Sequence, residues 1–264
     1  MLKSVAKAID ILNTFSSSEP CLTLAELARR RGLPKSTVHS LLSTLLASGF
    51  IEKLDDDSYA LGTAIIPLTQ AVRVNVELRD RAAPLLRKLA DDCRESVYLA
   101  VLDKDQALYI YAVESSRRLL ARTAVGDRVP LHCTSLGKAM LSYLSEAQVA
   151  AIVASVGLRA FTPATITDLD RLHAELAATR ARGYAVDVGE HETGVYCVGA
   201  PIFDQRGRVM AACSISGTNP EIVQDRCDEL AGFVVSAAQE ISHRMGYVAP
   251  RLSSLAGIIL SRPL

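Results

Sequence analysis

Hydrophobic and polar positions between residues 22 and 62 recur first with a helical period and then with that of a strand. Residues 23–26, Thr-Leu-Ala-Glu, match the capping box found at helix starts. Leu27 and Ala28 extend the apolar face of this helix, and Gly32 is suited to end it in a left-handed conformation. The pattern therefore predicts a short first helix over about 23–31.

A second helix is predicted from about residue 35 to residue 48. Its apolar face is formed by residues at helical spacing, namely Val38, Leu41, Leu42 and Leu45. Two short strands are predicted at 50–54 and 58–61, around three aspartates at 55–57. Helix, turn, helix and hairpin in this order predict a winged helix-turn-helix, which lays its second helix in the major groove of DNA. The alternative is a small helical subdomain whose polar face is incidental.

The exposed N-terminal end of the second predicted helix carries side chains that bond phosphates and base edges. These candidate DNA contacts are Lys35, Ser36, Thr37, His39 and Ser40. Further contacts to the phosphate backbone are expected from the end of the first helix and from the wing, through Arg29, Arg30, Arg31 and Tyr59. Residues 1–62 contain seven Lys or Arg and seven Asp or Glu, so the non-specific affinity for DNA should be modest.

The first fifteen residues predict an amphipathic helix. Its apolar residues are Val5, Ala8, Ile9, Leu12 and Phe15. One helix-turn-helix contacts too little DNA for tight specific binding, whereas two linked copies on a palindrome gain from their effective concentration. We therefore expect an obligate oligomer whose seam lies in residues 1–15.

The remainder of the chain alternates between the two periods. Helices are expected at 63–94, about 135–144 and 167–182, and strands at 97–102, 107–113, 119–124, 195–203 and 208–216. Within the first of these helices, Pro67 and Pro84 mark breaks or new starts.

The last predicted hairpin has the clearest register. With a four-residue loop at 204–207, Phe203 pairs with Arg208 and Cys197 lies opposite Ser214. Period-two alternation then gathers small residues on one face of the sheet: Cys197, Gly199, Ala212, Ser214 and Ser216. Small polar residues where a core would use Val or Leu indicate a cavity. A helix packed tightly over these small residues is the alternative.

Composition narrows the class of protein. The 264 residues suit one or two domains, and 49% hydrophobic residues suffice for a packed core. No apolar run approaches the roughly 20 residues of a membrane helix, and the N-terminus lacks the apolar core of a signal peptide. Six cysteines occur without a C-x-x-C pair, and His132, His173 and His243 show no metal-ligand spacing. We therefore expect a cytoplasmic protein without disulfides, metal or cofactor.

Two segments carry a longer motif. Residues 183–190 read Gly-Tyr-Ala-Val-Asp-Val-Gly-Glu, and 197–204 read Cys-Val-Gly-Ala-Pro-Ile-Phe-Asp. In its glycine, acidic residues, cysteine and final aromatic–Asp pair, this motif resembles the IclR family of bacterial transcription regulators. Residues 4–12 and 35–39 are similar to the N-terminal domain of that family. The resemblance covers essentially the whole chain, with departures at Ser40 and Ala60, where members often carry arginine.

The resemblance implies an α+β fold in four parts. These are a winged helix-turn-helix DNA-binding domain (1–62), a linker helix (63–80), a GAF-like α/β effector-binding domain with a mainly antiparallel sheet (81–250) and a C-terminal tail (251–264). It implies a transcriptional regulator, expected to be a repressor, that senses a small organic acid and binds operator DNA as a homodimer or dimer of dimers. The effector-binding residues it implies are Ser135, Leu136, Asp187, Cys197, Ser214 and Ser216.

Other functions remain open at this stage. Cys197, His191 and Asp187 lie close together in sequence and make up a familiar set for a thiol hydrolase. Such an enzyme needs a base or helix N-terminus to lower the pKa of the thiol, and nothing nearby marks an oxyanion hole. Cys197 or Cys213 is also a candidate for thiol redox sensing. Glu190 either orients a loop through backbone hydrogen bonds or is merely solvated.

Overall fold

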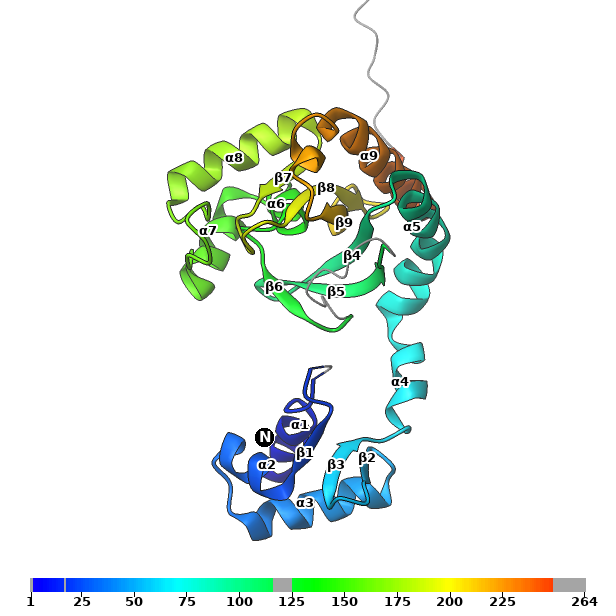
Figure 1. Cartoon of the computed structure of the whole chain (residues 1–264), viewed down its shortest axis with the longest axis vertical. Coiled ribbons are helices and arrows are strands. Elements are labelled where there is room, and N and C mark those ends of the chain that lie inside the picture. The colour runs from blue at the N-terminus through cyan, green and yellow to red at the C-terminus, as the bar shows by residue number, and fades with distance from the viewer. Residues whose placement is uncertain (1, 17, 116–124, 249–264) are drawn as a thin grey trace, which may run out of the picture. The chain divides into compact units, whose positions relative to one another are not determined.

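The computed structural model describes residues 2–16, 18–115 and 125–248. The chain forms two compact units, Met1–Val76 and Glu77–Leu264 (Figure 1). The strand predicted at 119–124 and the tail predicted at 251–264 lie outside the described residues. Among the described residues, no helix combines the length and apolar character needed to cross a membrane.

The first unit is a winged helix-turn-helix, as predicted. Its elements are α1 (Lys3–Leu12), β1 (Cys21–Thr23), α2 (Leu24–Arg31), α3 (Lys35–Ala47), β2 (Ile51–Lys53) and β3 (Ser58–Leu61). The strands form an antiparallel sheet in the order β1-β3-β2. Strand β1 was not predicted from the sequence, and it lengthens the wing into a three-stranded sheet.

Local signals in the sequence account for the boundaries of α2. The Thr23 hydroxyl accepts a hydrogen bond from the Glu26 N–H, and a Glu26 carboxylate oxygen accepts from the Thr23 N–H at 2.8 Å. Gly32 ends the helix with φ = 61°, a conformation that glycine adopts without a steric penalty. Cap and stop therefore lie where the pattern predicted them.

Helix α1 is amphipathic, but its apolar residues divide between two faces. Ile11 is fully buried and Phe15, just beyond the helix, is 9% exposed, and both belong to the core of the first unit. Val5 and Ile9 are about half exposed on the helix surface. Phe15 therefore packs into its own unit, whereas Val5 and Ile9 stay exposed and available for the predicted seam.

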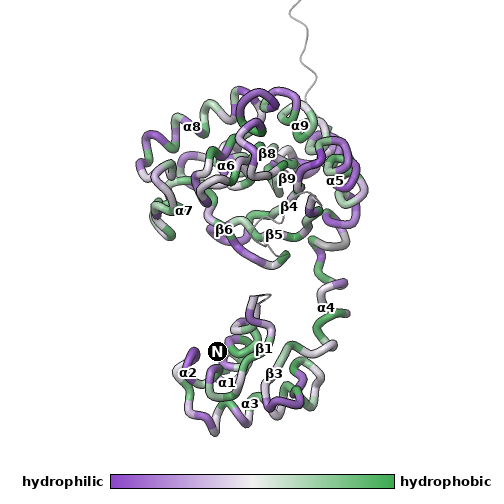
Figure 2. The backbone as a smooth tube through the Cα atoms, viewed as in Figure 1, coloured by the Kyte–Doolittle hydropathy of each residue, from purple (hydrophilic) through white to green (hydrophobic). Residues whose placement is uncertain are grey.

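A helical segment leads from the first unit into the second. It comprises α4 (Ile65–Ala71), a π-helical turn (Asn75–Arg79) and α5 (Asp80–Cys93). None of the residues of α4 is buried, although this helix is rich in hydrophobic residues (Figure 2). The predicted break at Pro84 is wrong, because Pro84 lies inside α5. A proline inside a helix removes one intrahelical hydrogen bond, and the helix continues through this position nonetheless.

The second unit is built on a six-stranded antiparallel sheet. Its further elements are β4 (Ser96–Asp103), β5 (Gln106–Val113), β6 (Arg128–Pro130), α6 (Ser135–Leu141), α7 (Glu146–Val156), α8 (Leu169–Arg182), β7 (Ala185–Val188), β8 (Tyr196–Phe203), β9 (Val209–Gly217), a 3-10 turn (Pro220–Val223) and α9 (Cys227–Arg244). The strand order is β6-β5-β4-β9-β8-β7. Helices α5 and α9 pack together on one face, and α6 covers the other with α7 and α8 beyond it (Figure 1). The predicted fold class is confirmed.

Two helices of this unit, α7 and α9, were not predicted. Helix α7 begins with a capping box in which Ser145 and Gln148 exchange hydrogen bonds. Helix α8 begins at Leu169 and not at the predicted Thr167. Its N-cap is Asp168, whose side chain accepts a hydrogen bond from the Arg171 N–H at 2.9 Å.

The register predicted for the last hairpin is wrong by two residues, although the faces are right. Cys197 pairs with Ser216 and not with Ser214, and the ladder contains a bulge between Ile202 and Phe203. The loop is longer than predicted because the Asp204 carboxylate accepts hydrogen bonds from two backbone amides beyond it. A shift by two residues keeps every side chain on its predicted face.

Helix α6 starts directly over the small-residue face of the sheet. A Cβ atom built on Gly199 would lie 3.0 Å from the carbonyl carbon of Ser135, so a larger residue would require the helix and β8 to move apart by a few tenths of an ångström. The tight packing proposed as an alternative to a cavity therefore exists at Gly199. The same face is open beside it, where the side chains of Ser214 and Ser216 line a cavity.

Candidate functional sites

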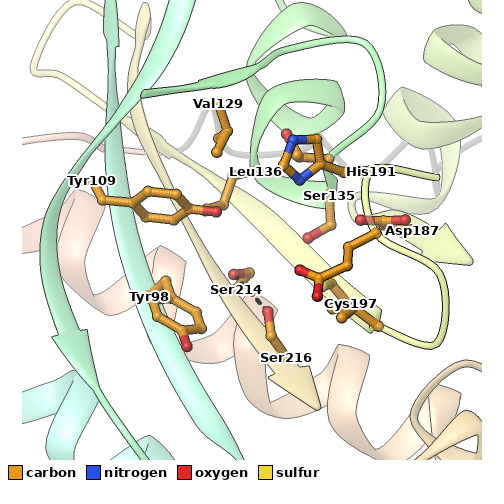
Figure 3. A pocket seen from close by; sticks show the side chains of 13 residues that line it. Tyr98, Tyr109, Val129, Ser135, Leu136, Asp187, His191, Cys197, Ser214 and Ser216 are labelled. Atoms are coloured by element: carbon orange, nitrogen blue, oxygen red, sulfur yellow. Dashed lines mark hydrogen bonds between the residues drawn. The ribbon is translucent and has the colours of Figure 1, made fainter. Parts of the chain in front are cut away.

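A cavity of about 80 Å³ lies between the sheet and the start of α6. This volume is well below the roughly 300–1,000 Å³ of sites for drug-sized ligands, and it suits a small metabolite. The sequence-predicted effector residues all line it: Ser135, Leu136, Asp187, Cys197, Ser214 and Ser216. The lining is completed by Tyr98, Tyr109, Val129, Thr134, His191, Glu192 and Val195. Figure 3 shows the two tyrosines on one side and Asp187, Cys197 and His191 on the other.

The serines and the tyrosines form adjoining parts of the lining. The hydroxyl oxygens of Ser214 and Ser216 lie 3.4 Å apart on β9, in the middle of the view in Figure 3. The rings of Tyr98 and Tyr109 meet edge to face with centroids 5.5 Å apart. Tyr98 pairs with Ser214 across β4 and β9, so pairing these two strands in the sequence would have identified it. The cavity therefore combines hydroxyl donors with an aromatic wall.

The start of α6 brings backbone amides to the cavity. Thr134 is the N-cap, and its hydroxyl accepts a hydrogen bond from the Gly137 N–H at 3.2 Å. The first amides of a helix have no acceptor within it, which leaves those of Ser135 and Leu136 for a ligand. Both residues are 2% exposed. The start of α6 is thus almost fully buried where it borders the cavity.

Asp187 is the buried acid of the cavity. It is 3% exposed, and one carboxylate oxygen accepts a hydrogen bond from the Glu190 N–H at 2.7 Å. Burial raises the pKa of Asp187 to about 7, while that hydrogen bond and the charge of Lys138 act in the opposite direction. Near neutral pH the carboxyl group therefore exists in both forms and can either accept or donate a hydrogen bond.

Cys197 is a poor nucleophile in this setting. Burial raises the pKa of its thiol, and the charge of Asp187 raises it further. Burial also raises the pKa of Cys213 to about 12 and lowers that of His191. A thiol hydrolase or a redox-sensing cysteine needs a stabilised thiolate. The surroundings of Cys197 favour a passive wall over a reactive group.

A buried ion pair that is not part of the cavity lining was not predicted. Lys138 of α6 is 1% exposed, and its ammonium group contacts a carboxylate oxygen of Glu190, with Glu175 at 3.7 Å. Glu190 itself is 6% exposed, so the solvated alternative for this residue is wrong. Its backbone N–H and carbonyl groups are hydrogen-bonded, in agreement with the loop-orienting alternative.

The first unit exposes the N-terminal end of α3. The side chains of Lys35, Ser36, His39 and Ser40 are exposed, Thr37 is half-buried, and Arg29 is exposed at the end of α2. Side chains of these types can reach phosphates and base edges once the helix lies in a groove. The candidate reading surface is therefore accessible.

Three other candidates for DNA contact are engaged within the unit. The Arg30 guanidinium donates two hydrogen bonds to Glu19, both at 2.7 Å, and Arg31 donates one to the Thr14 hydroxyl at 2.7 Å. Tyr59 is 6% exposed and lies in the core of the first unit. Because the Tyr59 ring is buried among the apolar side chains of its own unit, it is not available as a DNA contact.

Family models match both units of the chain. The model described as "IclR helix-turn-helix domain" matches residues 4–55, and "Bacterial transcriptional regulator IclR C-terminal" matches residues 70–243.

Among the residues that the structure describes, no group of three or more His, Cys, Asp or Glu is arranged to hold a metal ion.

Similar proteins extend over nearly the full chain. The acetate operon repressor of Salmonella typhimurium is 36% identical over 248 residues, which cover 93% of this chain and 90% of the relative. The crystal structure of the Thermotoga maritima IclR has a TM-score of 0.77 at 31% identity, covering 94% of this chain and 100% of that one. An IclR homologue from Microbacterium hydrocarbonoxydans in complex with 4-hydroxybenzoate has a TM-score of 0.84 at 25% identity, covering 92% and 98%.

Proposed function

The chain belongs to the IclR family of bacterial transcriptional regulators, and we propose that it is a repressor controlled by a small organic acid. Its first unit is the DNA-binding module, and the cavity of the second unit is the site for the effector. The convergence of Ser135, Asp187 and Ser214 on one small cavity carries this proposal. The DNA target puts the site of action in the bacterial cytoplasm.

The chemistry of the lining favours a ligand with one acid group and one hydrogen-bond donor. Asp187 and Glu192 supply two carboxylates, and His191 is the sole basic side chain among the lining residues. A second acid group on the ligand would therefore meet like charge. The 4-hydroxybenzoate bound to the relative from Microbacterium hydrocarbonoxydans has one carboxylate and one hydroxyl, which supports this class of ligand.

We orient the ligand by its two ends. Its carboxylate faces the amides of Ser135 and Leu136, which lie at the positive end of α6. The hydroxyls of Ser214 and Ser216 add donors from the sheet. The donor group of the ligand faces Asp187, and the body packs against Cys197 and the tyrosine pair.

The DNA contacts proposed for the first unit are those that remain accessible. Lys35, Ser36, Thr37, His39 and Ser40 read base edges and phosphates from α3, and Arg29, Arg30 and Arg31, none of which is buried, bind the phosphate backbone. A near-neutral module holds DNA weakly alone, so two copies act together on a palindromic operator. The seam includes Val5 and Ile9, which α1 leaves exposed.

The proposed functions divide the chain into consecutive ranges. We assign residues 1–62 to the DNA-binding domain, 63–80 to the linker and 81–250 to the effector domain.

The test is a thermal-shift screen of small carboxylic acids, followed by calorimetry with the acid that raises the melting temperature most. Replacing both cavity serines, Ser214→Ala with Ser216→Ala, should weaken binding of that acid by about 1–3 kcal/mol. Ser155→Ala on the exposed surface of α7 is the matched control and should leave the affinity unchanged. An unaltered affinity in the cavity variant would move the effector site elsewhere.

A further inference from the structure

One side of the cavity is closed by residues 189–195, the cap loop that joins β7 to β8. This loop contributes His191, Glu192 and Val195 to the lining. Its two ends meet through a hydrogen bond from the Gly189 N–H to the Val195 carbonyl at 2.9 Å. Whatever holds the cap loop in place therefore sets the shape of this wall.

The side chain of Glu190 anchors the cap loop to α6. Its carboxylate pairs with the ammonium group of Lys138, and both side chains are more than nine-tenths buried. Among the described residues, no hydrogen-bond partner lies against the other carboxylate oxygen of Glu190, although that atom is also buried. A charged group this deep is stable only with a compensating charge, so Lys138 is what keeps Glu190 inside.

The backbone of the cap loop is held from a second direction. Thr162 donates its hydroxyl proton to the Gly189 carbonyl at 2.7 Å, and Thr165 donates to the Glu190 carbonyl at 2.6 Å. The Glu190 N–H in turn donates to Asp187 in the cavity wall. A movement of Glu190 would therefore act directly on Asp187, which lines the cavity.

We infer that Lys138 and Glu190 are positioning residues of the cavity, whose buried ion pair locks the cap loop over the ligand. Neither residue lines the cavity, so both act through the loop. The inference rests on the proposed function in treating the cavity as a ligand site, and it adds the route by which the site opens. A buried ion pair suits such a lock, because both charges regain hydration when water enters.

Alkylation of Cys197 measures opening of the cap loop without any ligand. Cys197 lines the cavity and is 8% exposed, so a small reagent such as iodoacetamide reaches it only when the wall moves. Cys213 provides an internal control on the same chain. It is fully buried on the opposite face of the sheet, where its sulfur contacts the Val234 carbonyl of α9 at 3.9 Å.

Glu190→Gln and Lys138→Met should each speed labelling of Cys197 by about tenfold or more, while labelling of Cys213 stays slow, because each change removes a charge-assisted hydrogen bond of the closed loop. The double variant should label no faster than the faster single variant, because both changes remove the same ion pair. Lys88→Met is the matched control. It breaks an exposed ion pair with Asp92 on α5 and should change neither rate.

Unchanged labelling of Cys197 would overturn the inference, and so would equal acceleration of Cys213, which indicates general loosening. Additive effects in the double variant would contradict a shared ion pair. If Lys138→Met does not fold, Thr162→Val is a milder test of the same loop, because it removes the hydroxyl hydrogen bond to the Gly189 carbonyl and leaves the ion pair in place. It should also speed labelling of Cys197 and leave that of Cys213 unchanged. If the labelling rates change as expected but no acid binds in the thermal-shift screen, the proposed function is refuted and the role of the ion pair in holding the cap loop still stands.

Discussion

Replacing Asp187 with Asn removes one buried ionisable group from the cavity. The side-chain oxygen of Asn can still accept the hydrogen bond from the Glu190 N–H, so the geometry of the wall is preserved. Burial raises the pKa of Asp187 from 3.8 to about 7. The exchange therefore isolates the free-energy cost of ionising this carboxyl group inside the protein.

The magnitude follows from linkage between protonation and folding. Between pH 3.8 and about 7 the folded protein keeps a proton on Asp187 that the unfolded chain has lost. Stability from this group is therefore complete below the lower pKa and falls as the pH rises to the higher one. Roughly three pKa units at about 1.4 kcal/mol each correspond to about 4 kcal/mol across this window.

The assay is urea unfolding of the full chain at pH values from about 4 to 8, a range that spans both states of the carboxyl group. Tyrosine fluorescence reports mainly on the second unit, because Tyr59 is the one tyrosine of eight outside residues 77–264. Relative to Asp187→Asn, the wild type should lose about 4 kcal/mol of stability from the acidic to the neutral end. Parallel pH curves for the two proteins would refute the raised pKa.

Three further predictions concern DNA binding, packing and assembly. Thr37→Ala with His39→Ala should reduce operator affinity, relative to unrelated DNA, by about 1–3 kcal/mol for each base that these side chains read, and an unchanged preference would exclude this reading surface. Gly199→Ala should destabilise the second unit by about 1–3 kcal/mol in thermal unfolding, because its Cβ meets the Ser135 carbonyl carbon at 3.0 Å. Gly232→Ala in α9 is the matched control, since its Cβ meets nothing within 4 Å. Ile9→Asp should yield monomers in light scattering at micromolar concentration, and an intact oligomer would place the seam elsewhere.

Sequence reasoning succeeded where short-range rules decide the structure. The capping box at Thr23 and Glu26 and the apolar face of α3 depend on residues three or four positions apart, so the pattern contains the whole signal. The alternation of Cys197 and Ser214 likewise identified the correct face of the sheet. The capping box of α7 at Ser145 and Gln148 is an equally local signal, although α7 was not predicted.

Features that depend on distant partners were not predicted. Nothing local to Lys138 indicates burial, because its partner Glu190 lies 52 residues away along the chain. The direction of Tyr59 likewise depends on distant partners, because β3 pairs with β1 and β2. The register error in the last hairpin has a local cause instead. The Asp204 carboxylate accepts hydrogen bonds from the amides of Arg206 and Arg208, and the loop is longer than the four residues assumed.

The strand order has a consequence for how the protein is made. Strands β4 and β9 are neighbours at the centre of the sheet but lie about 100 residues apart in the sequence. At roughly 5–20 residues per second, the ribosome adds the intervening segment in about 5–20 s. The first unit, whose strands pair among themselves, can fold during this time. A nascent chain can therefore fold its helix-turn-helix unit well before the sheet of the second unit is complete, and one edge of β4 stays unpaired until β9 has been made.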